Sequence, residues 1–188
     1  YYQMEKAPVE KVGIVYEGDV ANRETSLITR AVLKGIFEPV LKERINVVNA
    51  ELATKSRGVE VVEGKNNDPD KASRLQVIIY AGKKSFTVAG TVLSNGLVRI
   101  TEIDGYRFDL TPAHYMIVVR NEDKPGMIGQ IGTFLGAAHV NIATMQVSRT
   151  QINATAMMFM TVDSEVEKET IKMIAGIDGI TASYFVKL

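Results

Sequence analysis

The chain has no cysteine among its 188 residues, and it has only two histidines. The absence of cysteine excludes disulfides, thiolate zinc sites and cysteine nucleophiles, and it fits a reducing compartment such as the cytoplasm. His114 and His139 lie far apart, with no carboxylate or nucleophile at a useful spacing. We therefore expect neither a metal site nor acid–base catalysis by histidine.

The chain also lacks an excess of either charge and any long hydrophobic run. Its 22 basic and 22 acidic side chains balance, so no overall positive field attracts nucleic acid or an anionic membrane. No segment approaches the roughly 20 apolar residues of a membrane helix. The first residues, Tyr1-Tyr2-Gln3-Met4, do not have the basic and then apolar character of a secretion signal. We expect a cytoplasmic fragment of a longer protein that binds neither nucleic acid nor a membrane.

What the chain does contain is enough apolar surface, at 46% hydrophobic residues, for one large or two small packed domains. Pro112 cannot donate a sheet hydrogen bond, and it biases Thr111 away from helical geometry. The backbone is therefore expected to be extended and redirected there. We predict a first domain over residues 1–111 and a second over residues 112–188.

In the first part of the chain, the spacing of apolar residues changes from a helical period to one typical of strands. We expect a strand from Lys11 to Tyr16, one long helix from Arg23 to Lys42, and a shorter helix from Val47 to Lys55 that Gly58 ends. Short β-rich segments follow, punctuated by glycine, and the polar residues 65–72 are expected to form a mobile loop. The segments are residues 59–62, 75–80, 85–92 and 97–103, separated by Gly64, Gly82 and the turn Ser94-Asn95-Gly96. This pattern predicts an α+β domain with a mostly antiparallel sheet.

The second part predicts a β-α-β-β-α-β arrangement, the ferredoxin-like split βαβ fold. Its first helix follows Pro125, which suits a first helical turn, and Asp123 is placed to cap that helix. The apolar face of this helix comprises Met127, Ile128, Ile131, Phe134, Leu135 and Ala138. Ser164 to Glu167 has the form of a capping box for the second helix, which Gly179 ends. The inner face of that helix comprises Val166, Thr170, Met173, Ile174 and Ile177. The expected strands are residues 114–121, 141–148, 154–162 and 180–188, and Met157 to Met160 are expected to pack in the core.

Two stretches carry a family resemblance. Residues 121–129, Asn-Glu-Asp-Lys-Pro-Gly-Met-Ile-Gly, with Leu135-Gly136 and Val140-Asn141-Ile142-Ala143, resemble the ACT domain, a family of amino-acid sensors. The preceding part, with residues 31–35, 47–50 and 89–92, is similar to the intervening allosteric substrate-binding domain of long-form D-3-phosphoglycerate dehydrogenases. Together the resemblances cover nearly the whole chain. They imply a homodimer or larger homo-oligomer in which L-serine, the end product of the pathway, binds the ACT domain and inhibits the enzyme.

An amino-acid site can also be argued from the residues of the loop. A zwitterion needs acceptors for its ammonium and donors for its carboxylate. Asp123 is the natural partner of the ammonium, Asn121 can meet the carboxylate or a hydroxyl, and Asn141 completes the set. The backbone N–H groups of residues 126–129 lie at a helix N-terminus. The expected effector-binding residues are Asn121, Asp123, Pro125, Gly126, Met127, Ile128, Asn141 and Ile142.

Each of these residues also has a purely structural interpretation. Asp123 can serve as the helix cap, Asn141 as a turn residue, and the glycines as sites of close helix packing, since they do not form G-x-G-x-x-G. In the first domain, Lys34, Asn49, Arg99 and Arg107 are candidates for an anion site near Gly90 and Thr91, as the resemblance implies for some members. Scattered surface cations are the alternative there.

No catalytic constellation is visible in the sequence. A dehydrogenase needs a dinucleotide-binding glycine fingerprint and an acid–base group, and neither occurs. We therefore expect no cofactor and no catalysis in this chain, and NAD in the parent enzyme. The alternatives are the regulatory part of an iron–sulfur L-serine dehydratase, which resembles the same two domains, and a free-standing amino-acid-sensing regulator.

Overall fold

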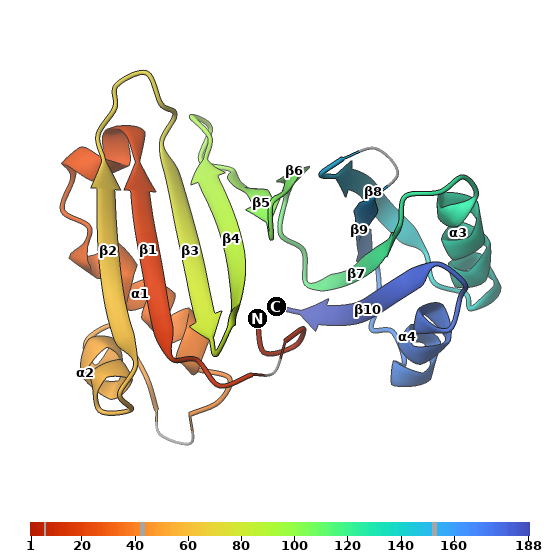
Figure 1. Cartoon of the computed structure of the whole chain (residues 1–188), viewed down its shortest axis with the longest axis horizontal. Helices are drawn as coiled ribbons and strands as arrows, with labels where there is room; N and C mark the ends of the chain where they lie inside the picture. The colour runs from red at the N-terminus through yellow and green to blue at the C-terminus, as the bar shows by residue number, and fades with distance from the viewer. Residues whose placement is uncertain (6, 42–43, 152–153) are drawn as a thin grey trace. The chain divides into compact units, whose positions relative to one another are not determined.

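The computed structural model describes residues 1–5, 7–41, 44–151 and 154–188, and the chain forms two compact units, Tyr1–Asp104 and Gly105–Leu188 (Figure 1). The chain passes from one unit to the other through Asp104 and Gly105, which both have positive φ, 49° and 81°. A two-residue type I′ turn requires this backbone, and Asp-Gly favours it. Both units contain helices and strands, which confirms the predicted α+β class.

The first unit is built on a sheet with the strand order β2-β1-β3-β4-β5. The central strand β1 pairs parallel with β2 and antiparallel with β3, and the remaining pairs are antiparallel, as predicted. The strands are β1 (Lys11–Glu17), β2 (Glu60–Asn66), β3 (Arg74–Ala81), β4 (Lys84–Val92) and β5 (Val98–Ile103).

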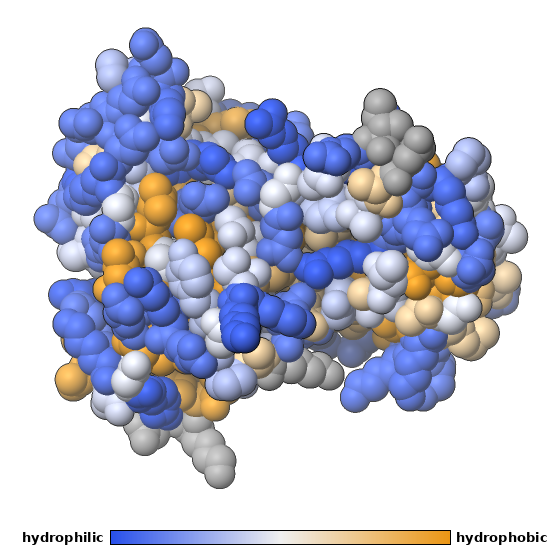
Figure 2. Space-filling view, in the orientation of Figure 1, coloured by the Kyte–Doolittle hydropathy of each residue, from blue (hydrophilic) through white to orange (hydrophobic). Residues whose placement is uncertain are grey.

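Helices cover one face of this sheet. They are the short 3-10 helix η1 (Gly18–Asn22), α1 (Ser26–Phe37) and α2 (Ala50–Lys55). Val12, Ile14 and Tyr16 alternate along β1 and are fully buried, and they belong to one core cluster with Leu33 and Phe37 of α1. In Figure 1, α1 crosses behind the strands. The opposite face, turned toward the viewer in Figure 2, keeps apolar surface over β1 and β2, where Val62 is 41% exposed.

The first unit differs from the sequence prediction in three places. The helix expected from Arg23 to Lys42 begins at Ser26 and ends at Phe37. Pro39 follows and has no N–H to donate, so the helical hydrogen bonds cannot continue through it. Lys42 lies outside the described residues. The second helix begins at Ala50 rather than Val47, since the Asn46 side chain accepts from the backbone N–H of Val48 and holds a turn there. Gly64 was expected to end a strand, but β2 continues through it to Asn66.

The second unit contains the predicted βαββαβ arrangement, preceded by one further strand. Its four-stranded sheet has the order β10-β7-β9-β8, and every pair in it is antiparallel. The elements are β6 (Tyr106–Leu110), β7 (Tyr115–Glu122), α3 (Met127–Ala137), β8 (Ile142–Arg149), β9 (Thr155–Val162), α4 (Lys168–Ala175) and β10 (Ile180–Lys187).

Both faces of this sheet are packed. On one face Ile131 and Leu135 of α3 and Ile174 of α4 are fully buried in a cluster with Met158 and Met160. On the other face β6 contributes Phe108, whose ring lies 6.2 Å from that of Phe159. The four residues Met157 to Met160 are each at most 3% exposed, so the packing interpretation of this run agrees with the structure.

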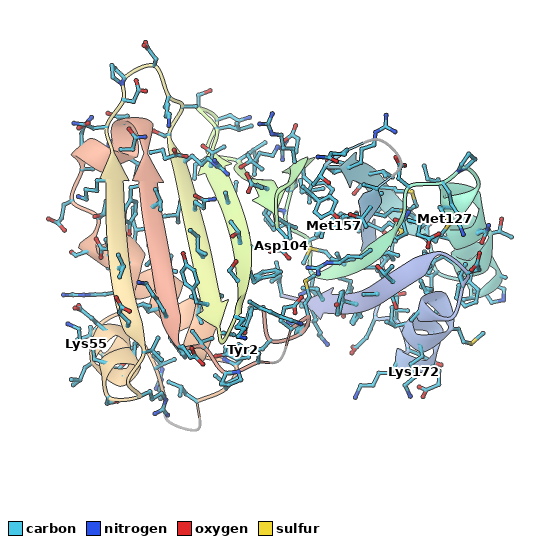
Figure 3. The ribbon with its side chains drawn as sticks, in the orientation of Figure 1. Tyr2, Lys55, Asp104, Met127, Met157 and Lys172 are labelled. Atoms are coloured by element: carbon cyan, nitrogen blue, oxygen red, sulfur yellow. The ribbon has the colours of Figure 1, made fainter. Side chains whose placement is uncertain are left out.

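The boundaries and faces of the two helices differ from the prediction. Ile128 and Met173 were placed on inner faces, but they are 53% and 60% exposed. The helix expected to open with Ser164 starts only at Lys168, and it ends with Gly176, not Gly179, at the C-cap. Figure 3 labels Met127 at the start of α3 and Lys172 on α4. The start of α3 positions the candidate site.

Candidate functional site

The candidate site begins where β7, an inner strand of the sheet, ends at Glu122. The chain reaches α3 through a turn in which Gly126 has φ +92° and ψ −16°. These values suit the third residue of a type II turn, which requires positive φ, and Pro125 suits the second. Gly126 is the N-cap of α3, so Pro125 lies before the helix and not in its first turn as predicted. The first N–H that bonds within α3 is that of Gln130, to Gly126 O. The backbone donors of residues 127–129 therefore have no partner within the helix.

Asn121 is the last residue but one of β7, and it is only 1% exposed. Its Nδ2 donates to the carbonyl oxygen of Glu122 at 2.6 Å. Its Oδ1 is buried and has no hydrogen-bond partner among the described residues. A buried acceptor without a donor costs about 1–3 kcal/mol, and native proteins leave few such groups. The loop therefore contains a buried acceptor that no donor among the described residues satisfies.

Asp123 is the charged acceptor of the loop, and the structure pairs it with a residue that the sequence analysis missed. Its Oδ2 accepts from Arg149 Nη1 at 3.2 Å. The Asp123 side chain is 23% exposed, and that of Arg149 is 55% exposed. The strand predicted from Asn141 ended at Ser148, one residue short of Arg149, and nothing in the local sequence indicates that the two residues meet.

Lys124 provides a fixed positive charge beside the same loop. Its Nζ lies 2.8 Å from Asp178 and 3.2 Å from Glu122. The hydrogen bond to Asp178, followed by that to Glu122, raises the pKa of Lys124 above its ordinary value. Lys124 therefore stays protonated and engaged with these carboxylates.

Asn141, by contrast, does not lie with Asn121 and Asp123. It precedes β8, and its Nδ2 donates to Asp163 Oδ2. β8 runs antiparallel to β9, and β9 antiparallel to β7, so the end of β7 is adjacent to Arg149 and not to Asn141. Asn141 and Arg149 are eight residue steps apart along the strand, a span of about 25 Å. Ile142 shares this distant end, so one chain does not assemble the predicted set.

The remaining predicted residues lie near the loop, in the first unit, or on β6 of the second unit. Met127, the first residue of α3, is 2% exposed, while Ile128 is exposed. Of the candidate anion residues, Lys34 pairs with Glu38 at 2.8 Å, and Asn49 bonds the backbone at Asn46 and Arg44. Arg99 is on β5, and Arg107 belongs to β6 of the second unit. The anion site stays a prediction.

Each unit also has a cavity away from this loop. In the first unit a cavity of about 590 Å³ lies above β3, β4 and β5, with Val77, Val88 and Ile100 in its lining. In the second unit a cavity of about 520 Å³ lies between the end of α3 and the start of α4, with His139 and Glu167 in its lining. Among the described residues no group of three or more histidines, aspartates or glutamates is placed to hold a metal ion. No helix in the described ranges is long and apolar enough to cross a membrane.

Comparison with known proteins finds matches for both parts of the chain. The family model described as "D-3-phosphoglycerate dehydrogenase intervening domain" matches residues 1–104, and that of the ACT domain matches residues 115–175. The predicted junction between Thr111 and Pro112 lies in the stretch between the matches and stays a prediction.

Curated relatives match nearly the whole chain. The D-3-phosphoglycerate dehydrogenase of Methanocaldococcus jannaschii is 34% identical over 92% of this chain and 33% of its own length. Those of Bacillus subtilis and Synechocystis are 33% and 34% identical over 99% of this chain, and over 36% and 34% of their own lengths. The chain thus spans about a third of the length of these relatives.

The fold and the matches define a two-domain α+β regulatory chain that ends in an ACT domain, a class of domain that binds amino acids and forms oligomers. The chain belongs to the D-3-phosphoglycerate dehydrogenase intervening domain family. Sequence resemblance had indicated the same two domains.

Proposed function

We propose that this chain is the regulatory region of a D-3-phosphoglycerate dehydrogenase, and that its ACT domain binds L-serine for feedback inhibition of serine biosynthesis. The catalytic part and its NAD would belong to the rest of the parent protein. The curated relatives reported above are all D-3-phosphoglycerate dehydrogenases, which favours this proposal over a serine dehydratase or a free-standing regulator.

The observation that carries the proposal is the buried Oδ1 of Asn121, which has no donor among the described residues. An ammonium group or a serine hydroxyl supplies such a donor, while Asp123 supplies a negative charge for the ammonium. The N–H groups at the start of α3 favour the carboxylate, because the helix dipole and unpaired donors both attract an anion. The loop therefore has a counterpart for each end of an amino acid.

The position of Asn141 supports a site formed by two copies of the chain. Within one chain, Asn141 precedes the first residue of β8, whereas Asp123 pairs with Arg149, the last residue of β8. Because β8 is an edge strand, a second copy can pair with it antiparallel, and such a pair brings Asn141 of one copy to the Asp123 end of the other. The family property of oligomerisation agrees with this arrangement.

We expect the chain to form an isologous dimer through β8. Replacing Val147 with lysine places a charge on this strand, where the side chain is 44% exposed, and a partner strand would bury that charge. Sedimentation should show a dimer for the wild type at tens of micromolar and a monomer for Val147→Lys. Val92→Lys in the first unit, 62% exposed on β4, serves as the control that should remain dimeric. A monomeric wild type with and without L-serine would contradict the dimer.

We expect Asp123→Asn to weaken L-serine binding by about ten- to a hundredfold. The variant keeps the size of the side chain but removes the charge that attracts the ammonium, a loss of about 1.5–3 kcal/mol. Calorimetric titration of the full chain measures the affinity, and the melting temperature reports its folding.

Asp178→Asn is the matched control for this variant. It removes a carboxylate that pairs with Lys124 and is 97% exposed, so L-serine affinity should stay within about threefold, in line with the small energies of exposed ion pairs. Equal affinity of Asp123→Asn and the wild type would remove Asp123 from the site. A wild-type chain that binds none of the common amino acids would refute the proposed function as a whole.

A further inference from the structure

We propose that Arg149 of β8 binds the carboxylate of the effector amino acid, and that its ion pair with Asp123 is the unliganded form of the site. The proposal rests on the proposed function, since it assigns a specificity-determining residue to that same loop. Arg149 would make the site selective for a zwitterion over an amine of the same shape.

The sheet register places Arg149 on the same face as Asn121. Asn121 pairs with Ala156 across β7 and β9, and Ala156 pairs with Arg149 across β9 and β8. Directly paired residues project to one side of a sheet, and this is the side covered by α3, since Met158 and Met160 alternate with Met157 on β9. Two strand spacings separate Asn121 from Arg149, about 10 Å between their Cα atoms. The residue between them is Ala156, which has a small side chain and is 1% exposed.

The two partners of the ion pair differ in how firmly they are held. Asp123 is 23% exposed, and its backbone N–H donates to the carbonyl of Ala154 at 3.3 Å. Arg149 is 55% exposed at the end of β8, so few contacts within its own chain oppose a swing of its long side chain. Asp123 can therefore remain in place while Arg149 moves to admit a ligand.

A zwitterion is the ligand that replaces this ion pair without leaving a charge unmatched. When the ammonium of the amino acid takes the place of Arg149 beside Asp123, Arg149 loses its partner. The carboxylate of the same ligand restores one, and the guanidinium can bind it through two parallel hydrogen bonds. An amine without a carboxylate would leave Arg149 unpaired. The nearby cation Lys124 is already engaged by Glu122 and Asp178.

The test compares L-serine with L-serinamide, which keeps the ammonium and the hydroxyl but has a neutral amide for the carboxylate. Calorimetric titration is carried out on the full chain as wild type, Arg149→Gln and Arg149→Lys. Arg57→Gln, an exposed arginine of the first unit, is the control. We expect Arg149→Gln to lower L-serine affinity by about ten- to a hundredfold, the range of a charge-assisted hydrogen bond. L-serinamide affinity should not fall, because its ammonium no longer has to displace Arg149 from Asp123, so the preference for L-serine over L-serinamide should fall toward one. Arg149→Lys should recover part of the preference for L-serine. Arg57→Gln should bind both compounds as the wild type does.

Two results would overturn the assignment of Arg149. If Arg149 only competes with the ligand for Asp123, Arg149→Gln should bind both compounds more tightly. If Arg149 is a surface ion pair alone, both affinities should stay within threefold of the wild type. In either case, a wild-type chain that binds L-serine leaves the proposed function intact. A wild-type chain that binds no amino acid would refute the proposed function, and the assignment of Arg149 with it. Unchanged melting temperatures establish that the variants are folded.

Discussion

Leu135→Ala is expected to destabilise the second unit by about 2–5 kcal/mol, the range for deleting a buried leucine side chain. Leu135 is fully buried on the inner face of α3, in the cluster that contains Ile131 and Met160. The substitution removes apolar contacts and leaves a cavity under the helix that begins at the candidate site. Amino-acid binding should weaken with it, because the donors at the start of α3 depend on the docked helix.

Hydrogen exchange measured by mass spectrometry reports the stability of each unit separately in this experiment. Peptides from residues 115–188 should lose protection in Leu135→Ala, while peptides from β1 and β3 should not, since the two units have separate core clusters. Ile128→Ala is the matched control on the same helix, because Ile128 is 53% exposed; its effect should stay within about 0.5 kcal/mol. Similar losses from Leu135→Ala and Ile128→Ala would show that α3 does not pack as described.

Gly18→Ala is expected to destabilise the first unit by about 2–5 kcal/mol, from backbone strain together with steric overlap. Gly18 has φ +70°, and a Cβ built there would overlap the carbonyl of Lys71 and lie 2.8 Å from the carbonyl carbon of Ala72. Both neighbours are backbone atoms of the loop between β2 and β3, so relief requires the loop to move. Urea denaturation of the full chain, followed with a probe in the first unit, measures the loss.

Gly58→Ala is the control that introduces the backbone strain without the steric overlap. Gly58 has nearly the same φ, +73°, but nothing lies within 4 Å of a Cβ at that position. It should lose only about 1–2 kcal/mol, the ordinary penalty for alanine in left-handed geometry. If the two variants lost the same stability, the close approach of the loop to Gly18 would be wrong.

The second unit could be predicted from sequence because its elements have strong local signals. The apolar run of Met116 to Val119 indicates a strand packed on both faces, and all four residues are at most 2% exposed. The turn Pro125-Gly126 marks the start of a helix because few other residues adopt its backbone geometry. These signals depend only on neighbouring residues.

Errors arose where a local signal was overlooked or where packing overrode it. Pro39 ends α1, and Asp104-Gly105 followed by the alternation of Tyr106, Phe108 and Leu110 indicates the strand β6; both signals are present in the sequence. Gly64 shows the opposite case. Although glycine usually interrupts a strand, pairing with Val15 in the parallel register of β1 and β2 keeps it in β2.

The sequence by itself determined the α+β class, the βαββαβ order of the second unit, and the loop from Asn121 to Gly126 as the place to look for a ligand. Turn chemistry and hydrophobic period are local properties, so they can be read along the chain. Only the tertiary structure decided that Arg149 meets Asp123, that Asn121 Oδ1 is buried without a donor, and that Asn141 lies at the far end of β8. These facts depend on strand order and register, which join residues that are distant in sequence, and no local pattern specifies which strands become neighbours.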